Sequence, residues 1–350
     1  MKMKASKNSL IIVGNGFDLA HKLNTSYNDF ILWYLNSCLK NFKQNGKYDD
    51  ELISINGSRN YVGESVDSIK TFLMLRTNNN IKLILDKNAF FSTLMNDLTL
   101  NRWVDVERIY YNAILNILDP MITHISKDIN NLNSGFKYLK NLLIKYLNQL
   151  DYNITLISGI VQNLYEIFSK ANVEVDGEKG EIYILNFNYT SVINQYVSDF
   201  LSEQFSIKIF NIHGKIDDPN SIIFGYGDEI DPNYEKIEHL NRNEYLTNFK
   251  TFGYLKNSNY RDLELFLNSS KYNTYIMGHS CGISDRLLLN TIFENENCES
   301  IKIFYHQKED NTNDFIDKTM EISRNFKLAG KKQMRNIIIP YDQSQSLIKN

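Results

Sequence analysis

Glycines and polar residues that can bind ligands or move protons follow five short apolar runs of this chain. The runs are rich in isoleucine and aromatic residues, as buried β-strands are. In an open parallel sheet the carboxyl ends of the strands share one edge, where ligands bind. We therefore expect the residues that follow the runs to meet. The runs are residues 10–13, 182–185, 207–210, 222–224 and 275–277, and the segments after them are 14–21, 186–190, 211–214, 225–228 and 278–285.

Gly14-Asn15-Gly16 could form a phosphate-binding turn. Two glycines let backbone N–H groups approach an anion, and the helix that follows adds its positive N-terminal end. The segment is not a full GxGxxG pattern, because position 19 is Leu, and no GK[ST] follows. A tight strand-to-helix turn that requires glycine explains the same residues equally well.

His213 lies in the segment after the third run and is a candidate general base, because histidine titrates near neutral pH. The alternative is a histidine that packs or bonds to the backbone. Asn188 follows the second run and could position a ribose hydroxyl or a water molecule. Its alternative is a cap or a turn.

The segment 278–282 matches the GxSxG pattern of serine hydrolases, between an expected strand and an expected helix. In that fold an acid and then a histidine follow the serine along the chain. The only histidine after Ser280 is His306, 26 residues later, which is too soon for this order. A hydrolase triad is therefore not expected. His279 and Cys281 have no HExxH or CxxC spacing, so no metal site is expected either.

The middle of the chain has mostly helical spacing. Apolar stripes indicate helices near residues 103–120, 136–150 and 154–171. The first of them starts with Trp103, Asp105 and Glu107. One of these two acids is expected to point toward the Gly14 cleft, although acids are also common in a first helical turn. Residues 45–60 and 78–80 are expected to be loops.

Strands return after Gly180 and alternate with helical segments near residues 284–293 and 312–326. Besides the runs above, residues 301–305 and 337–339 are expected strands. This alternation predicts an α/β fold with a mostly parallel sheet. Because one strand lies at the start and the others near the end, a large helical insertion follows the first strand. The expected core is residues 1–60 and 176–350, and the insertion is residues 61–175.

Length and composition exclude several classes. A chain of 350 residues suits one large domain with an insertion. The 38 Lys and Arg nearly balance the 41 Asp and Glu, so charge gives no case for nucleic-acid binding. Cys38, Cys281 and Cys298 are far apart, so neither a disulfide framework nor a zinc site is expected. No apolar run is long enough for a membrane span, and a cytoplasmic location is expected.

Taken together, the motifs resemble those of the AbiH family of phage abortive-infection proteins. The first motif, residues 14–21, is long and rather specific. Lys22 and Asn24 stand where the family pattern is expected to carry Gly and Pro. The resemblance extends over nearly the whole chain. The matching segments are 14–21, 25–27, 29–30, 103–107, 186–190, 212–214, 224–227 and 278–280, followed by Asp285.

The motifs are more distantly similar to sirtuin-like NAD-binding domains. That resemblance implies a Rossmann-like fold and a site for NAD or a related nucleotide. Thr190 stands where sirtuin-like defence NADases usually carry Asp. The four zinc-binding cysteines of the deacylases are missing, so protein deacylation is not expected. The matching residues are Gly14, Gly16, Asn188, Tyr189, His213, Gly214, Gly278, Ser280 and Asp285.

The resemblance implies an NAD+ glycohydrolase that depletes cellular NAD on infection, with NAD+ as substrate and no tightly bound cofactor. His213 and Asn188 would be the catalytic residues, with His213 as the base. The expected ligand-binding residues are Gly14, Asn15 and Gly16 at the pyrophosphate, Asp18 near the ribose, and Ser280 and Asp285 at the adenosine half. Tyr189 is also an expected ligand-binding residue, with no part of the ligand assigned to it.

The alternative is a nucleotide-binding sensor or a toxin module without NAD turnover. Thr190 in place of Asp favours the sensor. A two-metal nuclease is not expected, because no carboxylates have metal-binding spacing. A phage-derived trigger and a second copy of the chain are the macromolecular partners to consider.

Overall fold

The computed structural model describes residues 8–63, 65–85, 87–100, 105–119, 121, 128–174, 179–200 and 205–348. A six-stranded sheet has the order β6-β5-β1-β7-β8-β9, and each pair of neighbours in it is parallel. This confirms the expected α/β fold, with one strand from the start of the chain. The strands are β1 (Asn8–Val13), β5 (Ile182–Asn186), β6 (Ile207–Asn211), β7 (Tyr272–Met277), β8 (Cys298–Tyr305) and β9 (Gln345–Ser346).

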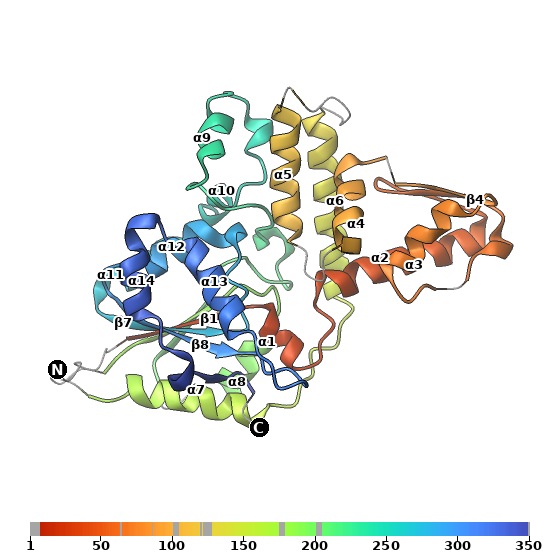
Figure 1. The fold of residues 1–350 in the computed structure, drawn as a ribbon. Helices are drawn as coiled ribbons and strands as arrows, with labels where there is room; N and C mark the ends of the chain where they lie inside the picture. Colours follow the sequence, from red (N-terminus) through yellow and green to blue (C-terminus); the bar gives the residue numbers. More distant parts are fainter. Residues whose placement is uncertain are drawn as a thin grey trace.

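Strand β1 lies inside the sheet because it is apolar on both faces. Leu10 and Ile12 pack in one hydrophobic cluster, and Ile11 and Val13 pack in another. Alternate side chains of a strand point to opposite faces, so helices must cover both sides. Figure 1 shows these helices above and below the sheet. On the Leu10 side lie α11 (Asn259–Ser269), α12 (Arg286–Phe293), α13 (Phe315–Asn325) and α14 (Lys331–Ile337), and on the Ile11 side lie α7 (Ser158–Ala171) and α8 (Val192–Phe200).

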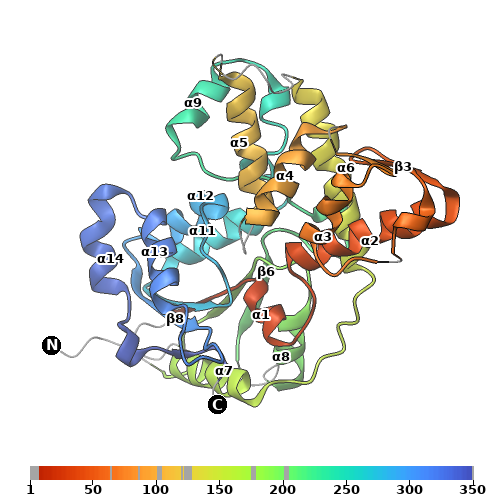
Figure 2. The same ribbon diagram turned by 45° about the vertical axis from the view of Figure 1, so that its right-hand side comes forward.

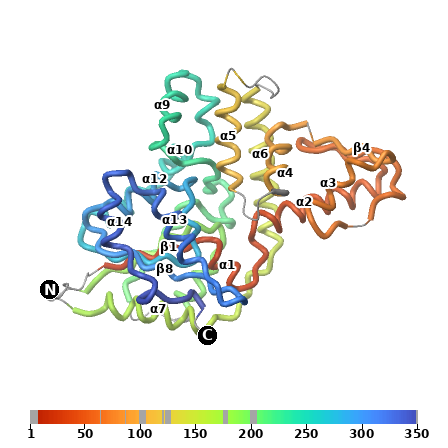
Figure 3. Tube along the Cα trace, in the orientation of Figure 1, coloured from red at the N-terminus to blue at the C-terminus, as the bar shows by residue number. Residues whose placement is uncertain are grey.

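A second group of elements shares its own hydrophobic cluster, to which residues 216–249 also contribute. Figures 1 and 2 both show α5 and α6 side by side above the sheet, with α2, α3 and a small antiparallel sheet extending away from it. The trace in Figure 3 leaves the main sheet after α1 and returns to it with α7. These elements are α2 (Tyr27–Asn45), β2 (Lys47–Asp49), β3 (Ser54–Gly57), α3 (Ile69–Met74), β4 (Ile81–Ile84), α4 (Ala89–Leu100), α5 (Val106–Leu118) and α6 (Ile129–Leu147).

Short helices complete the connections. They are α1 (Asn15–Ala20), α9 (Pro232–Glu238), α10 (Lys250–Tyr254) and the 3-10 helices η1 (Arg59–Tyr61), η2 (Leu75–Thr77), η3 (Pro219–Ser221), η4 (Asn243–Tyr245), η5 (Ile283–Asp285), η6 (Leu328–Gly330) and η7 (Tyr341–Gln343).

Two expected strands and one expected loop are wrong. Residues 222–224 form no strand, and the Ile223 N–H instead donates to the His213 carbonyl at 2.9 Å. Helix α14 ends at residue 337, and Ile338 makes only an isolated bridge to Ile301. Short apolar runs also occur in buried loops and at helix ends, and periodicity cannot separate these cases. Residues 45–60, expected to be a loop, contain β2 and β3.

The three helices expected in the middle are present with shifted ends. The first is α5, which begins at Val106 because the Asp105 carboxylate caps it, accepting from the Arg108 N–H at 3.0 Å. Asp128 caps the start of α6 in the same way. The third is α7, which begins at Ser158. Trp103 lies outside the described residues.

Candidate functional site

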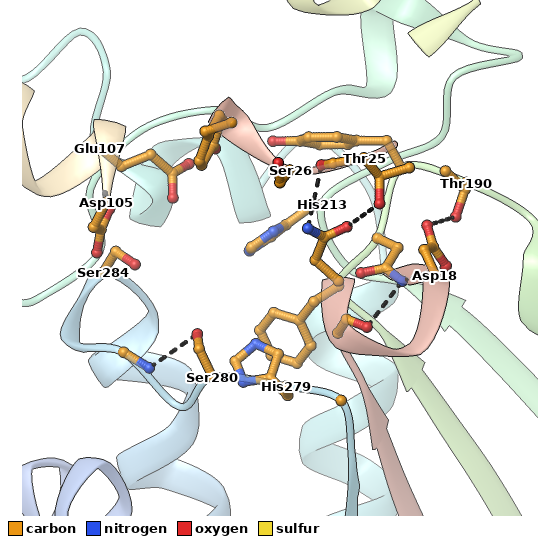
Figure 4. Close-up of a pocket in the computed structure, with 18 of the residues that line it drawn as sticks. Asp18, Thr25, Ser26, Asp105, Glu107, Thr190, His213, His279, Ser280 and Ser284 are labelled. Atoms are coloured by element: carbon orange, nitrogen blue, oxygen red, sulfur yellow. Dashed lines mark hydrogen bonds between the residues drawn. The ribbon is translucent and has the colours of Figure 1, made fainter. Parts of the chain in front are cut away.

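A pocket lies at the carboxyl edge of the main sheet, between the strand ends and helices α5 and α6. Its empty volume, with the open mouth and the solvent space in it included, is about 1130 Å³. Figure 4 shows side chains from both groups of elements facing this space. Of the nine residues expected at the site, eight line it and Gly16 does not. The eight are Gly14, Asn15, Asp18, Asn188, Tyr189, His213, Ser280 and Asp285.

Gly16 supports the turn that shapes the pocket. Its N–H donates to the Gly278 carbonyl at 2.8 Å, and a Cβ at residue 16 would lie 2.7 Å from that oxygen. The Gly14 N–H donates to the Met277 carbonyl, and the Phe17 N–H donates to the Gly14 carbonyl. The Gly14 and Gly16 N–H groups therefore hold two segments together at close range, while the Phe17 N–H closes the turn itself, and each already has a partner within the protein.

We expect Gly278→Ala to destabilise the protein more than Gly46→Ala does. Both glycines have a left-handed backbone, with φ of +73° and +78°, which costs about 1–3 kcal/mol for other residues. A Cβ at residue 278 would also lie 2.1 Å from the Phe17 nitrogen, whereas at residue 46 the nearest atom is 3.8 Å away. Urea unfolding of both variants isolates the steric part. Equal losses of unfolding free energy would show that the two loops do not cross this closely.

Asp18 is the centre of a buried hydrogen-bond group beneath the pocket. Asn188 Nδ2 donates to Asp18 Oδ1 at 2.9 Å and to the Gly14 carbonyl at 3.1 Å. Thr190 Oγ1 donates to Asp18 Oδ2 at 2.6 Å. Burial raises the pKa of Asp18 to about 7, although these two hydrogen bonds act in the opposite direction. The group joins the end of β5 to the glycine turn (Figure 4).

Asn15 positions the next loop. Its Oδ1 accepts from Thr25 Oγ1 at 2.6 Å, and its Nδ2 donates to the Thr25 carbonyl at 3.2 Å. Ser26 then caps α2 by accepting from the Asp29 N–H at 3.1 Å. This arrangement brings Tyr27, the first residue of α2, into the lining of the pocket.

His213 belongs to a buried charged group that extends from the pocket into the protein. Its Nε2 lies 3.2 Å from Asp285 Oδ1, and this carboxylate oxygen also accepts from the Lys250 ammonium at 2.6 Å. Lys250 is fully buried and donates as well to Glu107 Oε2 at 2.8 Å. The second oxygen of Glu107 accepts from the Gly225 N–H at 2.9 Å. One ammonium group thus contacts two carboxyl groups that belong to different groups of elements.

The charges in this group set the protonation of its members. Burial first, and then the nearby Lys250, hold the pKa of His213 below its ordinary value, so the ring is neutral at pH 7. Burial opposes ionisation of Asp285, but Lys250 and the histidines outweigh it and hold its pKa low. Burial, with Asp285 and Asp105 nearby, raises the pKa of Glu107 to about 8.

His279 is a second neutral histidine in the pocket. Its Nδ1 accepts from the Cys281 N–H at 2.9 Å, so Nε2 carries the proton and lies 3.7 Å from Asp285 Oδ2. Burial lowers the pKa of His279 to about 3. Since Nδ1 is occupied, this ring is not a base for Ser280, whose Oγ accepts from the Gly282 N–H at 3.4 Å.

Both acids at the start of α5 reach the pocket. Asp105 and Glu107 line it together with Ser284, and Figure 4 shows them facing His213 across the open space. Burial raises the pKa of Asp105 as well. Positions 105 and 107 are two apart and do not share a helix face. They reach one site because Asp105 is the cap and Glu107 lies in the first turn.

Lys250 is the functional residue that sequence reasoning missed. It is the first residue of the short helix α10, and nothing local distinguishes it from other lysines. Its partners Glu107 and Asp285 are 143 and 35 residues away along the chain. A buried lysine shows itself only through such distant partners. Tyr27 also lines the pocket. In the sequence it stood out only as part of a motif shared with the AbiH family.

The described residues hold neither a candidate metal site nor a candidate membrane-spanning helix. Among those residues no group of three or more His, Cys, Asp or Glu is placed to hold a metal ion. No helix in the same part of the chain is long and apolar enough to cross a membrane.

Comparison with known proteins decides the family. The model of the family described as bacteriophage abortive infection AbiH matches residues 10–307. The chain belongs to the AbiH family. The match includes most of β1, the glycine turn, both acids at the start of α5 and the strand ends up to β8, so the whole pocket lies within it. As a member of the AbiH family, the protein has a role in abortive infection, a defence against bacteriophage. No curated protein matches the chain significantly.

Proposed function

We propose that this AbiH protein cleaves the bond between nicotinamide and ribose in NAD+, and that the loss of NAD stops phage growth in an infected cell. The abortive-infection role of the family and the sirtuin-like motifs support this function. The observation that carries it is a neutral histidine held by a carboxylate inside the pocket. His213 Nε2 lies 3.2 Å from Asp285, on the same pocket lining as Asn188.

The proposed reaction uses water as the only co-reactant. The bond between ribose C1′ and the pyridinium nitrogen breaks, and neutral nicotinamide leaves with the electron pair. Water adds to the cation-like C1′ and gives one proton to His213, which yields ADP-ribose. His213 suits this step because its lowered pKa keeps it unprotonated at pH 7, and Asp285 orients the ring.

The geometry supports particular roles for the other residues. Asp285 faces the two histidines and Lys250, so we assign it to orienting the base in place of the adenosine contact. Asn188 uses both amide hydrogens on Asp18 and Gly14, which leaves its Oδ1 for a ribose hydroxyl. The binding roles of Gly14, Asn15, Tyr189 and Ser280 stay predictions.

Incubation of the purified protein with NAD+, followed by chromatography, tests the function. We expect equal amounts of nicotinamide and ADP-ribose. Asn188→Ala should lower the rate, whereas Asn56→Ala, on the exposed part of β3, is the matched control and should not. If calorimetry shows that NAD+ binds but chromatography finds no product, the protein is a nucleotide sensor and the enzymatic function is wrong.

We expect Thr190→Asp to destabilise the protein at alkaline pH. Thr190 donates to Asp18 at 2.6 Å, and two buried carboxyls at this distance cannot both ionise. Already in the wild type, burial raises the pKa of Asp18 from 3.8 to about 7. Its contribution to stability is therefore present below its ordinary pKa and is lost as the pH rises to about 7. A second carboxyl extends this loss to higher pH.

The uncharged variant Thr190→Asn has the size of Asp and is the matched control. Urea unfolding at about pH 6 and about pH 9 should separate the two variants more at the higher pH. Equal midpoints at about pH 9 would contradict the contact between residues 18 and 190.

A further inference from the structure

The lining of the pocket is rich in carboxyl groups. Asp18, Asp105, Glu107 and Asp285 all belong to it, and among the described lining residues there is neither a lysine nor an arginine. Lys250, buried behind the lining, balances Asp285. Both histidines are neutral. The pocket is therefore negative as soon as any one of Asp18, Asp105 or Glu107 ionises.

The pocket also offers unused hydrogen-bond acceptors to a ligand. The two amide hydrogens of Asn188 are both donated, to a carboxylate and a carbonyl, which fixes the orientation of this amide. Its Oδ1 accepts no hydrogen bond from any residue that the structure describes, although Asn188 is only 8% exposed and lines the pocket. A buried acceptor of this kind favours a ligand that donates.

Aromatic rings complete this surface. Tyr27, Phe187 and Tyr189 line the same pocket as the carboxyls. The faces of aromatic rings attract cations, and this attraction increases where water is excluded. Carboxylates, aromatic rings and a free amide oxygen together suit a flat cationic group that carries hydrogen-bond donors.

The same lining gives little support to a phosphate. A phosphate site needs free backbone N–H groups or cationic side chains. At the glycine turn the N–H groups of Gly14, Gly16 and Phe17 already donate within the protein. An ionised Asp18, Asp105 or Glu107 would repel an anion, so this part of the pocket favours a cation over a phosphate.

We propose that the pocket binds the positively charged pyridinium end of an oxidised nicotinamide nucleotide and discriminates against the uncharged, reduced ring. The choice of this ligand rests on the proposed function. Ionised carboxyls attract the positive charge of the bound ring, and they also attract the positive charge that develops during the reaction. As the glycosidic bond breaks, the positive charge moves from the ring to C1′, where a negative pocket stabilises it.

Two small molecules that differ only in ring charge provide the test. 1-Methylnicotinamide is a pyridinium cation without a glycosidic bond, and 1-methyl-1,4-dihydronicotinamide is its neutral, reduced form. Calorimetric titration of the wild-type protein should show at least tenfold tighter binding of the cation. Equal affinities, or tighter binding of the neutral ring, would overturn the proposal.

A charge-removing variant identifies the group responsible. Asp105→Asn keeps the helix cap, since Asn caps as well as Asp, and should remove most of the preference for the cation. Asp217→Asn removes an exposed carboxylate outside the pocket and should leave the preference intact. An unchanged preference in Asp105→Asn would count against this assignment.

The outcome is independent of turnover, because neither probe can be hydrolysed at a glycosidic bond. A protein that prefers the cation but never cleaves NAD+ would retain this inference and lose the enzymatic function. A protein that cleaves NAD+ with no preference for ring charge would keep the enzymatic function and lose this inference.

Discussion

Replacement of Lys250 by Met is expected to cost about 3–5 kcal/mol of unfolding free energy, because it leaves buried carboxylates without their cation. Lys250 is fully buried and donates to Glu107 at 2.8 Å and to Asp285 at 2.6 Å. Typical domains are stable by only about 5–15 kcal/mol. The loss is therefore a large share of the total, and urea unfolding measures it.

The pH dependence of Lys250→Met distinguishes lost charge pairing from lost packing. Without the ammonium, the pKa values of Glu107 and Asp285 rise in the folded state. Stability is then present at low pH, where both carboxyls are protonated, and is lost as the pH rises. Lys256→Met, at an exposed lysine, is the control and should unfold like the wild type. A variant Lys250→Met as stable as this control would show that the buried group does not form.

The neutral triple variant Glu107→Gln, Lys250→Met, Asp285→Asn extends this prediction. Removal of all three charges avoids an unpaired buried ion, so we expect it to recover much of the stability lost in Lys250→Met. The difference in unfolding free energy between this triple variant and Lys250→Met measures how much of the loss is due to unpaired buried charge.

Replacement of His213 by Ala is expected to lower NAD+ cleavage about 10²–10⁴-fold, the usual loss for a general base. Initial rates of nicotinamide release measure it. His213 is buried against Phe187 and Asp285, with ring centroids of His213 and Phe187 5.0 Å apart. We therefore expect a loss of roughly 1–3 kcal/mol in stability as well, and the rates must be compared on folded protein.

His239→Ala is the matched control, because this histidine is exposed at the end of α9. In the wild type the rate should fall on acidification only below the ordinary histidine pKa of 6.5, since burial holds the His213 value lower. Full activity of folded His213→Ala would exclude the proposed base.

The pattern of apolar residues along the chain was enough to predict those elements whose burial depends on their own sequence. The run at residues 10–13 is apolar at every position, which predicts a strand covered on both faces, and this strand does pair in parallel on both sides. The same rule predicted that the segments following the strands share one edge, and Gly14, Asn188, His213 and Ser280 do line one pocket. Local pattern failed at residues 222–224 and 337–339, where apolar side chains belong to a loop and a helix end.

The sequence by itself determined the α/β class, the place of the first strand in the main parallel sheet and the approximate set of residues at the pocket. Only the tertiary structure decided how their charges pair. Lys250 joins Glu107 and Asp285, and Thr190 with Asn188 joins Asp18, across separations of 35 to 172 residues. Periodicity reports which face of an element is buried, because burial follows from neighbours along the chain. The partner of a buried charge depends on which distant backbone segment lies within about 3 Å, and no local pattern contains that distance.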